Sequence, residues 1–184
     1  MNFLNLEQLE SGLSTIRQAP RDRGVLRMIV RRPDVEQREV VEQGALDLAQ
    51  GLVGDNWRAR GSKKTPDGSA HPDMQLTIMG ARAIELVAGT RERWSLAGDQ
   101  LFVDFDLSEE NLPAGTRLSI GEAVVRISEM PHTGCRKFEA RFGLDALRFV
   151  NSPAGRSLRL RGLNAKIIQP GMIRAGDLVH KAES

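Results

Sequence analysis

The chain has 184 residues, of which 40% are hydrophobic and 27% are charged, and its formal net charge is +2. This composition is that of an ordinary globular domain, and the length suits one domain with a sizeable core. No apolar run approaches the ~20 residues of a membrane-spanning helix, and the small net charge gives no reason to expect a nucleic-acid partner. The first residues lack the basic and apolar regions of a secretory signal, so with one cysteine we expect a cytoplasmic protein.

The first third of the chain predicts a helix followed by strands. Leucine and isoleucine residues recur every three or four positions in residues 4–18, which predicts an amphipathic helix that Pro20 ends. Residues 24–31 are aliphatic and β-branched and predict a strand, with residues 36–42 as a partner strand. Residues 51–72 are rich in Gly, Asp, Pro and Lys and exceed the usual connection length, which indicates a functional or a mobile loop.

The remainder of the chain predicts short strands separated by turns. Residues 74–78 predict a strand, and residues 81–87 predict a helix. Further strands are expected at residues 102–106, 117–120, 123–127, 158–161, 165–168 and 178–180. Many short strands with few helices indicate a mainly β (α+β) fold, either a barrel or a sandwich. We expect a single domain over residues 24–184, preceded by an N-terminal helical extension over residues 1–23.

Cys135 is the only cysteine, so it can form neither an intramolecular disulfide nor a cage of several thiolates. It precedes a predicted short helix, whose first backbone N–H groups would face the sulfur. His132, Arg136 and Lys137 are close in sequence and favour a thiolate, the form that acts as nucleophile and metal ligand. The alternative is a buried, inert thiol. Gly134 would allow a bulky ligand to approach, or would serve only a tight turn.

An ordered series of turns in the second half of the chain is more specific than any one of them. The turns are AGDQL (97–101), NLPAG (111–115), IG (120–121), PHTGC (131–135), RFG (141–143), RGL (161–163) and PG with AGD (170–171 and 175–177). GLVGD (51–55) and MQLT (74–77) precede them. In this order and spacing, the series resembles the MOSC family, named for the C-terminal domain of molybdenum cofactor sulfurase, over roughly residues 24–180.

The resemblance implies a MOSC-type β-barrel with a few short helices and a cleft for the molybdenum cofactor (molybdopterin). It makes Cys135 and His132 the candidate catalytic residues and Cys135 the candidate metal ligand. It implies a molybdenum-dependent reductase of N-hydroxylated or N-oxygenated small molecules, or a sulfur transferase. The alternative is a non-catalytic persulfide sulfur carrier for metal–sulfur cofactor assembly, and a third possibility is an interaction domain whose cysteine is inert.

The resemblance also implies separate partner proteins. The chain is expected to be a stand-alone domain, without the pyridoxal-phosphate domain of the full sulfurase or a fused iron–sulfur domain. Pyridoxal phosphate binding is therefore only a family-level label here. The expected partner is a cysteine desulfurase or a separate electron-donor protein.

A pterin cofactor carries a phosphate, so the implied site needs hydrogen-bond donors. The cofactor-binding candidates are Arg136, Lys137, Arg141, Arg159, Arg161, Asn164, His71 and Gln75, and Lys63 and Lys64 could close over an anion from the long loop. Arg159 and Arg161 are spaced to share one face of a predicted strand. The alternative for each cation is a solvated surface charge, and for Asn164 a role in a turn. Asp55 and Asp99 each follow a glycine, and turns explain them better than a hard-metal site does.

Overall fold

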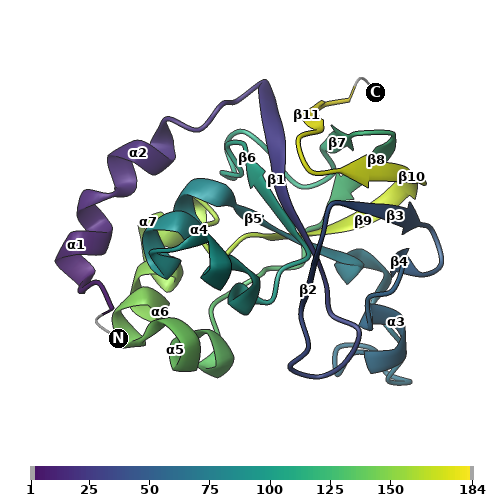
Figure 1. Ribbon diagram of the computed structural model, residues 1–184, viewed down its shortest axis with the longest axis horizontal. Coiled ribbons are helices and arrows are strands. Elements are labelled where there is room, and N and C mark those ends of the chain that lie inside the picture. Colours follow the sequence, from purple (N-terminus) through teal and green to yellow (C-terminus); the bar gives the residue numbers. More distant parts are fainter. Residues whose placement is uncertain (1–2, 183–184) are drawn as a thin grey trace.

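In the computed structural model, which describes residues 3–182, seven strands close into a mixed β-barrel (Figure 1). The order is β1-β6-β5-β9-β8-β7-β11, and β11 pairs back with β1 to complete the closure. The strands are β1 (Arg23–Arg31), β5 (Leu76–Gly80), β6 (Leu101–Asp104), β7 (Arg117–Ile120), β8 (Ala123–Ile127), β9 (Leu163–Gln169) and β11 (Leu178–Lys181). β5 and β6 run parallel, and the other neighbouring pairs are antiparallel. The predicted β-barrel is confirmed.

A second, smaller sheet lies on one side of the barrel (Figure 1). Its strands are β10 (Gly171–Arg174), β3 (Gln43–Asp47) and β4 (Gly51–Leu52), in that spatial order. β2 (Glu39–Val41) pairs with the end of β1 and begins after a loop that follows that strand. The short helices α3 (Trp57–Arg60) and η1 (Pro72–Met74) interrupt the long 51–72 connection.

Most helices gather on the opposite side of the barrel (Figure 1). They are α1 (Leu6–Ser11), α2 (Leu13–Arg17), α4 (Ala81–Ala88), η2 (Arg91–Ala97), α5 (Arg136–Phe142), α6 (Leu144–Asn151) and α7 (Pro153–Ser157). None of the helices in residues 3–182 has the length and apolar character needed to cross a membrane.

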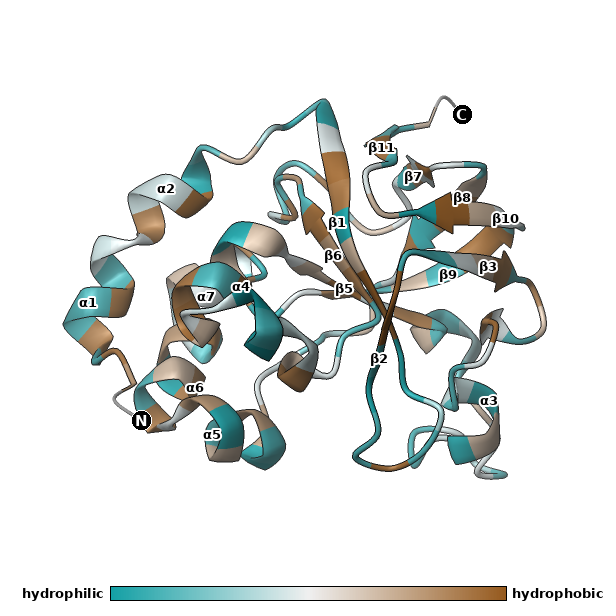
Figure 2. Cartoon of the chain, viewed as in Figure 1, coloured by the Kyte–Doolittle hydropathy of each residue, from teal (hydrophilic) through white to brown (hydrophobic). Residues whose placement is uncertain are grey.

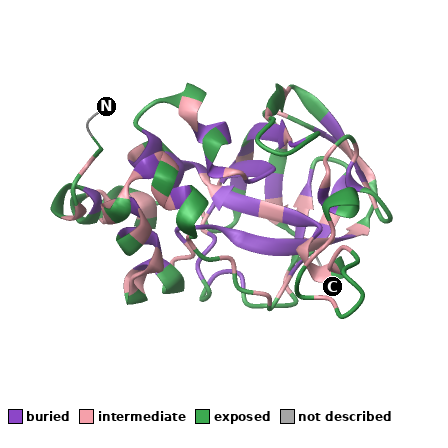
Figure 3. Cartoon of the chain, turned by 90° about the horizontal axis from the view of Figure 1, so that it is seen from below, coloured by how far each residue is buried: buried purple, intermediate pink, exposed green. Residues whose placement is uncertain are grey.

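The alternation of side chains along the strands builds two cores. In β6, Leu101 and Val103 point into the barrel, while Phe102 between them packs toward the helices. The strands are accordingly brown along much of their length in Figure 2 and buried in Figure 3, whereas the outer helix faces and the loops are exposed. Each fully buried side chain of this size contributes about 1.5–3 kcal/mol. Both faces of the barrel wall near β6 are therefore held firmly.

Several local predictions need correction. The helix expected over residues 4–18 is two helices, α1 and α2, which meet at Gly12 close to the Leu86 side chain. Residues 158–161 are not a strand but a turn, in which Arg159 adopts a φ of 48°. The helices α6 and α7 were not predicted. Gly143, expected to be part of a turn, is the N-cap residue of α6, and Pro153 is the first residue of α7 after the N-cap Ser152.

The expected extension contains α1 and α2, while its boundary with the following domain stays a prediction. Residues 1–2 and 183–184, the outer ends of the two expected segments, lie outside the described residues.

Candidate functional site

Cys135 lies exposed at a polar pocket between the barrel and the helices. It is the N-cap residue of α5, so the predicted loop-to-helix junction is confirmed. The pocket encloses about 830 Å³ of empty space, part of it open to solvent. Its cationic lining residues are Arg32, Arg38, Arg60, Lys137, Arg141 and Arg161. Asp34 and Glu36 are the carboxylates among its lining residues, so positive charge predominates.

The loop that carries Cys135 is fastened from two sides. Asn151 of α6 accepts a hydrogen bond from the Gly134 N–H (2.9 Å) and donates one to its carbonyl (3.2 Å). Asn164 of β9 donates to the carbonyls of Met130 (3.0 Å) and Pro131 (3.3 Å). A Cβ on Gly134 would lie 2.7 Å from the Leu147 side chain, so this glycine is needed for packing against α6. It does not provide space for a ligand.

A buried carboxylate joins two of the predicted residues. Asp99 is fully buried, and its Oδ1 lies 2.8 Å from Nε2 of His132. Its Oδ2 accepts a hydrogen bond from Nη1 of Arg161, at 2.5 Å. The Arg161 guanidinium also lies over the Phe138 ring of α5, 5.0 Å from the ring centroid. Asp99 therefore fixes both side chains at the pocket wall, a role beyond that of a turn residue.

Burial and neighbouring charges set the ionisation states of Asp99 and His132. Burial lowers the pKa of His132, and the charge of Arg161 lowers it further, while Asp99 opposes both effects. Burial alone would raise the pKa of Asp99, but Arg161 and His132 outweigh it, and the net shift is downward. At neutral pH we therefore expect an ionised Asp99 and a neutral His132 that donates from Nε2. Nδ1 is then left as a hydrogen-bond acceptor, and it has no partner within residues 3–182.

Three successive carbonyl oxygens hold three of the arginines in place. The carbonyl of Leu96 accepts from Arg141 (2.8 Å), that of Ala97 from Arg161 (2.9 Å), and that of Gly98 from Arg32 (2.9 Å). Gly98 has a φ of +87°, which favours glycine, and a Cβ there would lie 3.6 Å from Nη2 of Arg38 and 3.8 Å from Nη1 of Arg141. The end of η2 thus gathers four guanidinium groups around one turn.

Arg38 and Arg60 lack carboxylate partners within the described part of the chain. Neither forms an ion pair there, and the buried Nε of Arg38 has no hydrogen-bond acceptor. Burial and the charges of Arg141 and Arg32 lower the pKa of Arg38. Partial burial of its guanidinium and the charge of Arg32 likewise lower the pKa of Arg60, although the residue as a whole is exposed. Crowded cations with unused donors are the chemistry of an anion-binding site.

Sequence reasoning missed Arg32, Arg38 and Arg60. Arg32 forms a bidentate pair with Asp55, whose Oδ1 also accepts from the Trp57 N–H (2.9 Å), so the predicted turn role of Asp55 is present as well. Arg60 lies in the long connection that was expected to be functional or mobile. That unusual length was the signal for Arg60, whereas no local pattern marked Arg38.

The structure brings some predicted site residues together and separates others. Cys135, His132, Lys137, Arg141 and Arg161 line the pocket. Arg136, Lys63 and Lys64 are exposed and do not belong to its lining.

Three further candidates have structural partners. Gln75 is buried; its Nε2 donates to the Leu48 carbonyl and its Oε1 accepts from the Ile167 N–H. Nδ1 of His71 accepts from the Asp73 N–H at the start of η1. Asn164 shapes the cysteine loop, as described above, and its buried Oδ1 has no partner among the described residues.

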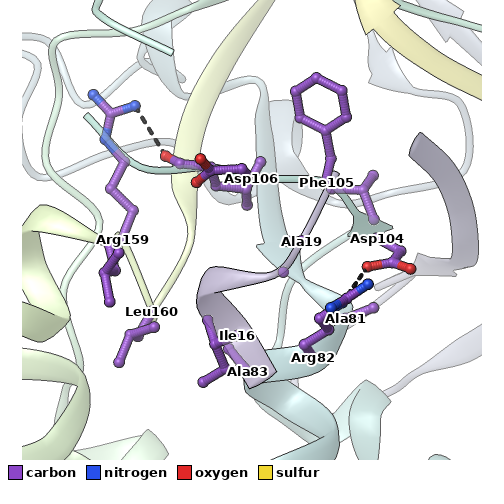
Figure 4. A pocket seen from close by; sticks show the side chains of 14 residues that line it. Ile16, Ala19, Ala81, Arg82, Ala83, Asp104, Phe105, Asp106, Arg159 and Leu160 are labelled. Carbon is purple, nitrogen blue, oxygen red and sulfur yellow. Dashed lines mark hydrogen bonds and ion pairs between the residues drawn. The ribbon is translucent and has the colours of Figure 1, made fainter. Parts of the chain in front are cut away.

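Arg159 lies in a different, mainly apolar pocket (Figure 4). Its Nη1 donates to the carbonyls of Leu112 (2.6 Å) and Leu107 (3.4 Å). The strand that was to place Arg159 and Arg161 on one face is a turn, so their side chains part. The expectation that the two arginines share one face is wrong.

Comparison with known proteins gives the family from a family model and the fold from solved structures. A family model described as "MOSC domain" matches residues 71–180, more than half of the chain. A search of curated proteins finds no match.

Three solved structures resemble the model. The YuaD protein from Bacillus subtilis is 16% identical, with a TM-score of 0.62, over 88% of this chain and 97% of that one. YiiM from Escherichia coli is 18% identical (TM-score 0.55; 87% and 70%), and YiiM from Geobacillus stearothermophilus is 17% identical (0.52; 87% and 73%). At these identities the likeness establishes the shared fold alone.

Proposed function

We propose, because the chain belongs to the MOSC domain family, that the Cys135 pocket binds a molybdenum cofactor with Cys135 as the thiolate ligand of the metal. One observation carries this proposal: the single exposed cysteine lies at a pocket whose arginines Arg38 and Arg60 have no carboxylate partners among the described residues. The first feature suits a soft metal centre, and the second suits the cofactor's phosphate.

The donor set of the pocket fits such a cofactor. The Nε atoms of Arg38 and Arg161 are buried without acceptors in residues 3–182, so an oxyanion would satisfy groups that are otherwise costly to bury. Arg141 and Arg161 are already held by backbone carbonyls, which reduces the entropy that binding would cost. Gly98 has no side chain beside the Arg38 and Arg141 guanidinium groups, where a Cβ would lie in van der Waals contact with both.

The residues of the chain would divide the work as follows. Arg38 and Arg60 would bind the phosphate, and Cys135 would hold the metal, which supplies two-electron reduction of N-hydroxylated or N-oxygenated compounds. Asp99 would keep His132 in the tautomer with a proton on Nε2. Nδ1 of His132 would then accept a hydrogen bond from a hydroxyl group of the bound substrate. Electrons would come from a separate donor protein.

Metal analysis tests this proposal. The protein is made in a host that synthesises the cofactor, and its molybdenum content is compared with that of Cys135→Ser and Arg159→Gln. We expect molybdenum in the wild type and in Arg159→Gln, and its loss in Cys135→Ser. Equal molybdenum in the wild type and Cys135→Ser, or none in either, would refute the role of Cys135 as ligand.

The exposure of Cys135 also favours a second candidate function, that of a persulfide carrier. Its thiolate would attack the terminal sulfur of a persulfide on a cysteine desulfurase, and the desulfurase cysteine would leave as a thiolate. Mass spectrometry after incubation with a desulfurase and cysteine should then show Cys135 heavier by one sulfur atom. Unchanged mass would exclude this function. Both functions need a reduced thiol, as in the cytoplasm.

A further inference from the structure

The loop between β1 and β2 reaches over the Cys135 pocket. Asp34, Val35, Glu36 and Arg38 of this loop all line the pocket. Most of the loop is hydrophilic (Figure 2), and the exposed Val35 is an apolar exception. The loop therefore forms one wall of a site whose other walls belong to α5, η2 and the 131–135 loop.

Glu36 fastens this loop to α5. Its Oε1 accepts a hydrogen bond from Nζ of Lys137 at 2.9 Å, and its Oε2 accepts one from Nη2 of Arg141. Lys137 and Arg141 are separated by one helical turn and lie just after Cys135. A single carboxylate thus pairs with two cations of the pocket and offsets one of their two charges.

The backbone and the surroundings indicate that this contact can be exchanged. Glu36 has a φ of 61°, a left-handed conformation that is uncommon for residues other than glycine. Its side chain is 57% exposed, and that of Lys137 is 67% exposed. The exposed pair of Glu36 with Lys137 is therefore weak in water, whereas the Arg141 side chain is only 17% exposed. Hydrogen bonds from Lys137 and Arg141 lower the pKa of Glu36, so its carboxylate is charged at neutral pH.

We propose that Lys137 and Arg141 form an oxyanion subsite that Glu36 fills in the ligand-free protein, and that a carboxylate- or phosphate-bearing ligand displaces Glu36 and releases the loop. Two donors on one helical turn suit the two oxygens of such a group. The inference deepens the proposed function, on which it rests in taking the ligand of this pocket to be an anion. The carboxylate of Glu36 then competes with anions for Lys137 and Arg141, so that weakly binding anions do not occupy this subsite.

Alkylation of Cys135 tests this proposal, because the protein has no other cysteine. In this reaction the thiolate forms a carbon–sulfur bond and iodide leaves. The rate with anionic iodoacetate is measured against inorganic phosphate concentration, with neutral iodoacetamide as the reference reagent. Glu39→Gln is the matched control, because Glu39 follows the same loop and pairs with Arg31 without lining the pocket.

In Glu36→Gln, we expect phosphate to protect Cys135 at a concentration roughly threefold lower than in the wild type, as removal of an exposed ion-pair partner allows. The ratio of the iodoacetate rate to the iodoacetamide rate should rise by a similar factor. Glu39→Gln should leave both quantities unchanged. Equal or weaker protection in Glu36→Gln, an equal shift in Glu39→Gln, or no protection by phosphate in any of these proteins would overturn the proposal.

These outcomes are separate from those of the metal analysis. If the protein holds no molybdenum but phosphate protects Glu36→Gln at a lower concentration, the cofactor proposal is refuted and the oxyanion subsite is retained. If the protein holds molybdenum through Cys135 and Glu36→Gln does not change the protecting concentration, only the oxyanion subsite is refuted.

Discussion

The turn at residues 159–161 contributes one arginine to each of two pockets, and the two pockets are built on opposite principles. In the pocket of Arg159, polar groups are matched. Arg82 pairs with Asp104 (Figure 4), and Arg159 donates to the carbonyls of Leu107 and Leu112. The rest of its wall is largely apolar. Polar groups of this kind are satisfied by the fold itself.

In the pocket of Arg161, the cations exceed the acceptors that the fold provides. Arg161 and Arg32 have buried carboxylate partners, but Arg38 and Arg60 have none within residues 3–182. Arg60 is exposed, but the Nε atoms of Arg38 and Arg161 are buried without an acceptor among these residues, and such donors cost free energy unless a ligand satisfies them. The comparison teaches that unsatisfied donors, and not the apolar character of a hollow, distinguish the candidate binding site.

The largest expected effect tests the buried pair of Asp99 and Arg161. Asp99→Ala would leave the Arg161 guanidinium buried without its carboxylate, which should lower the free energy of unfolding by about 3–5 kcal/mol. Asp104→Ala in the other pocket removes a partly exposed pair and should cost less than about 1 kcal/mol. Urea unfolding measures both values. Similar losses in the two variants would show that the pockets do not differ in this respect.

The next effect concerns binding. Arg38→Gln removes a cation without a carboxylate partner and should weaken the binding of inorganic phosphate about tenfold, the typical loss for a charge-assisted hydrogen bond. Arg159→Gln, the matched change in the other pocket, should leave the affinity unchanged. Isothermal titration calorimetry provides the dissociation constants. An equal loss of affinity in both variants would indicate that phosphate is attracted by the overall charge of the protein and does not bind at a defined site.

The dependence of folding stability on pH gives a smaller expected effect. Because the pKa of His132 is lowered in the folded protein, the unfolded chain binds the proton more readily, and stability falls as the pH drops below about 6.5. Between pH 7.5 and 5.5 the wild type should lose about 1 kcal/mol more than His132→Gln, which cannot titrate. Parallel slopes for wild type and His132→Gln would contradict the buried neutral histidine.

The smallest effect comes from glycines with positive φ. Gly98→Ala and Gly176→Ala, with φ values of +87° and +97°, should each cost about 1 kcal/mol of stability. Of these two glycines, only Gly98 has arginine side chains within 4 Å of an added Cβ. Phosphate affinity should therefore change, by less than about threefold, in Gly98→Ala alone. If Gly176→Ala changes the phosphate affinity as much as Gly98→Ala does, the turn at Gly98 has no specific role in shaping the pocket.

Short-range patterns predicted most strands and their turns, because strand formation and glycine turns depend on a few adjacent residues. The same patterns misassigned residues 158–161. The alternation of leucine and arginine there suits a strand, but the bend before β9 requires the positive φ values of Arg159 and Gly162. Local composition does not report such tertiary requirements.

By itself, the sequence indicated the family and its β-barrel through the order and spacing of its turns, and it placed Cys135 at the start of a helix through the few residues around it. Tertiary structure alone decided which charges share the pocket. Glu36 meets Arg141 across 105 positions, and His132 meets Asp99 across 33. Arg159, Gln75 and His71, which the sequence offered as cofactor contacts, lie outside the pocket lining. Closure of the barrel brings Arg32, Arg141 and Arg161 to the turn at Gly98, although they are far apart in the sequence. No spacing along the chain predicts that these residues come together.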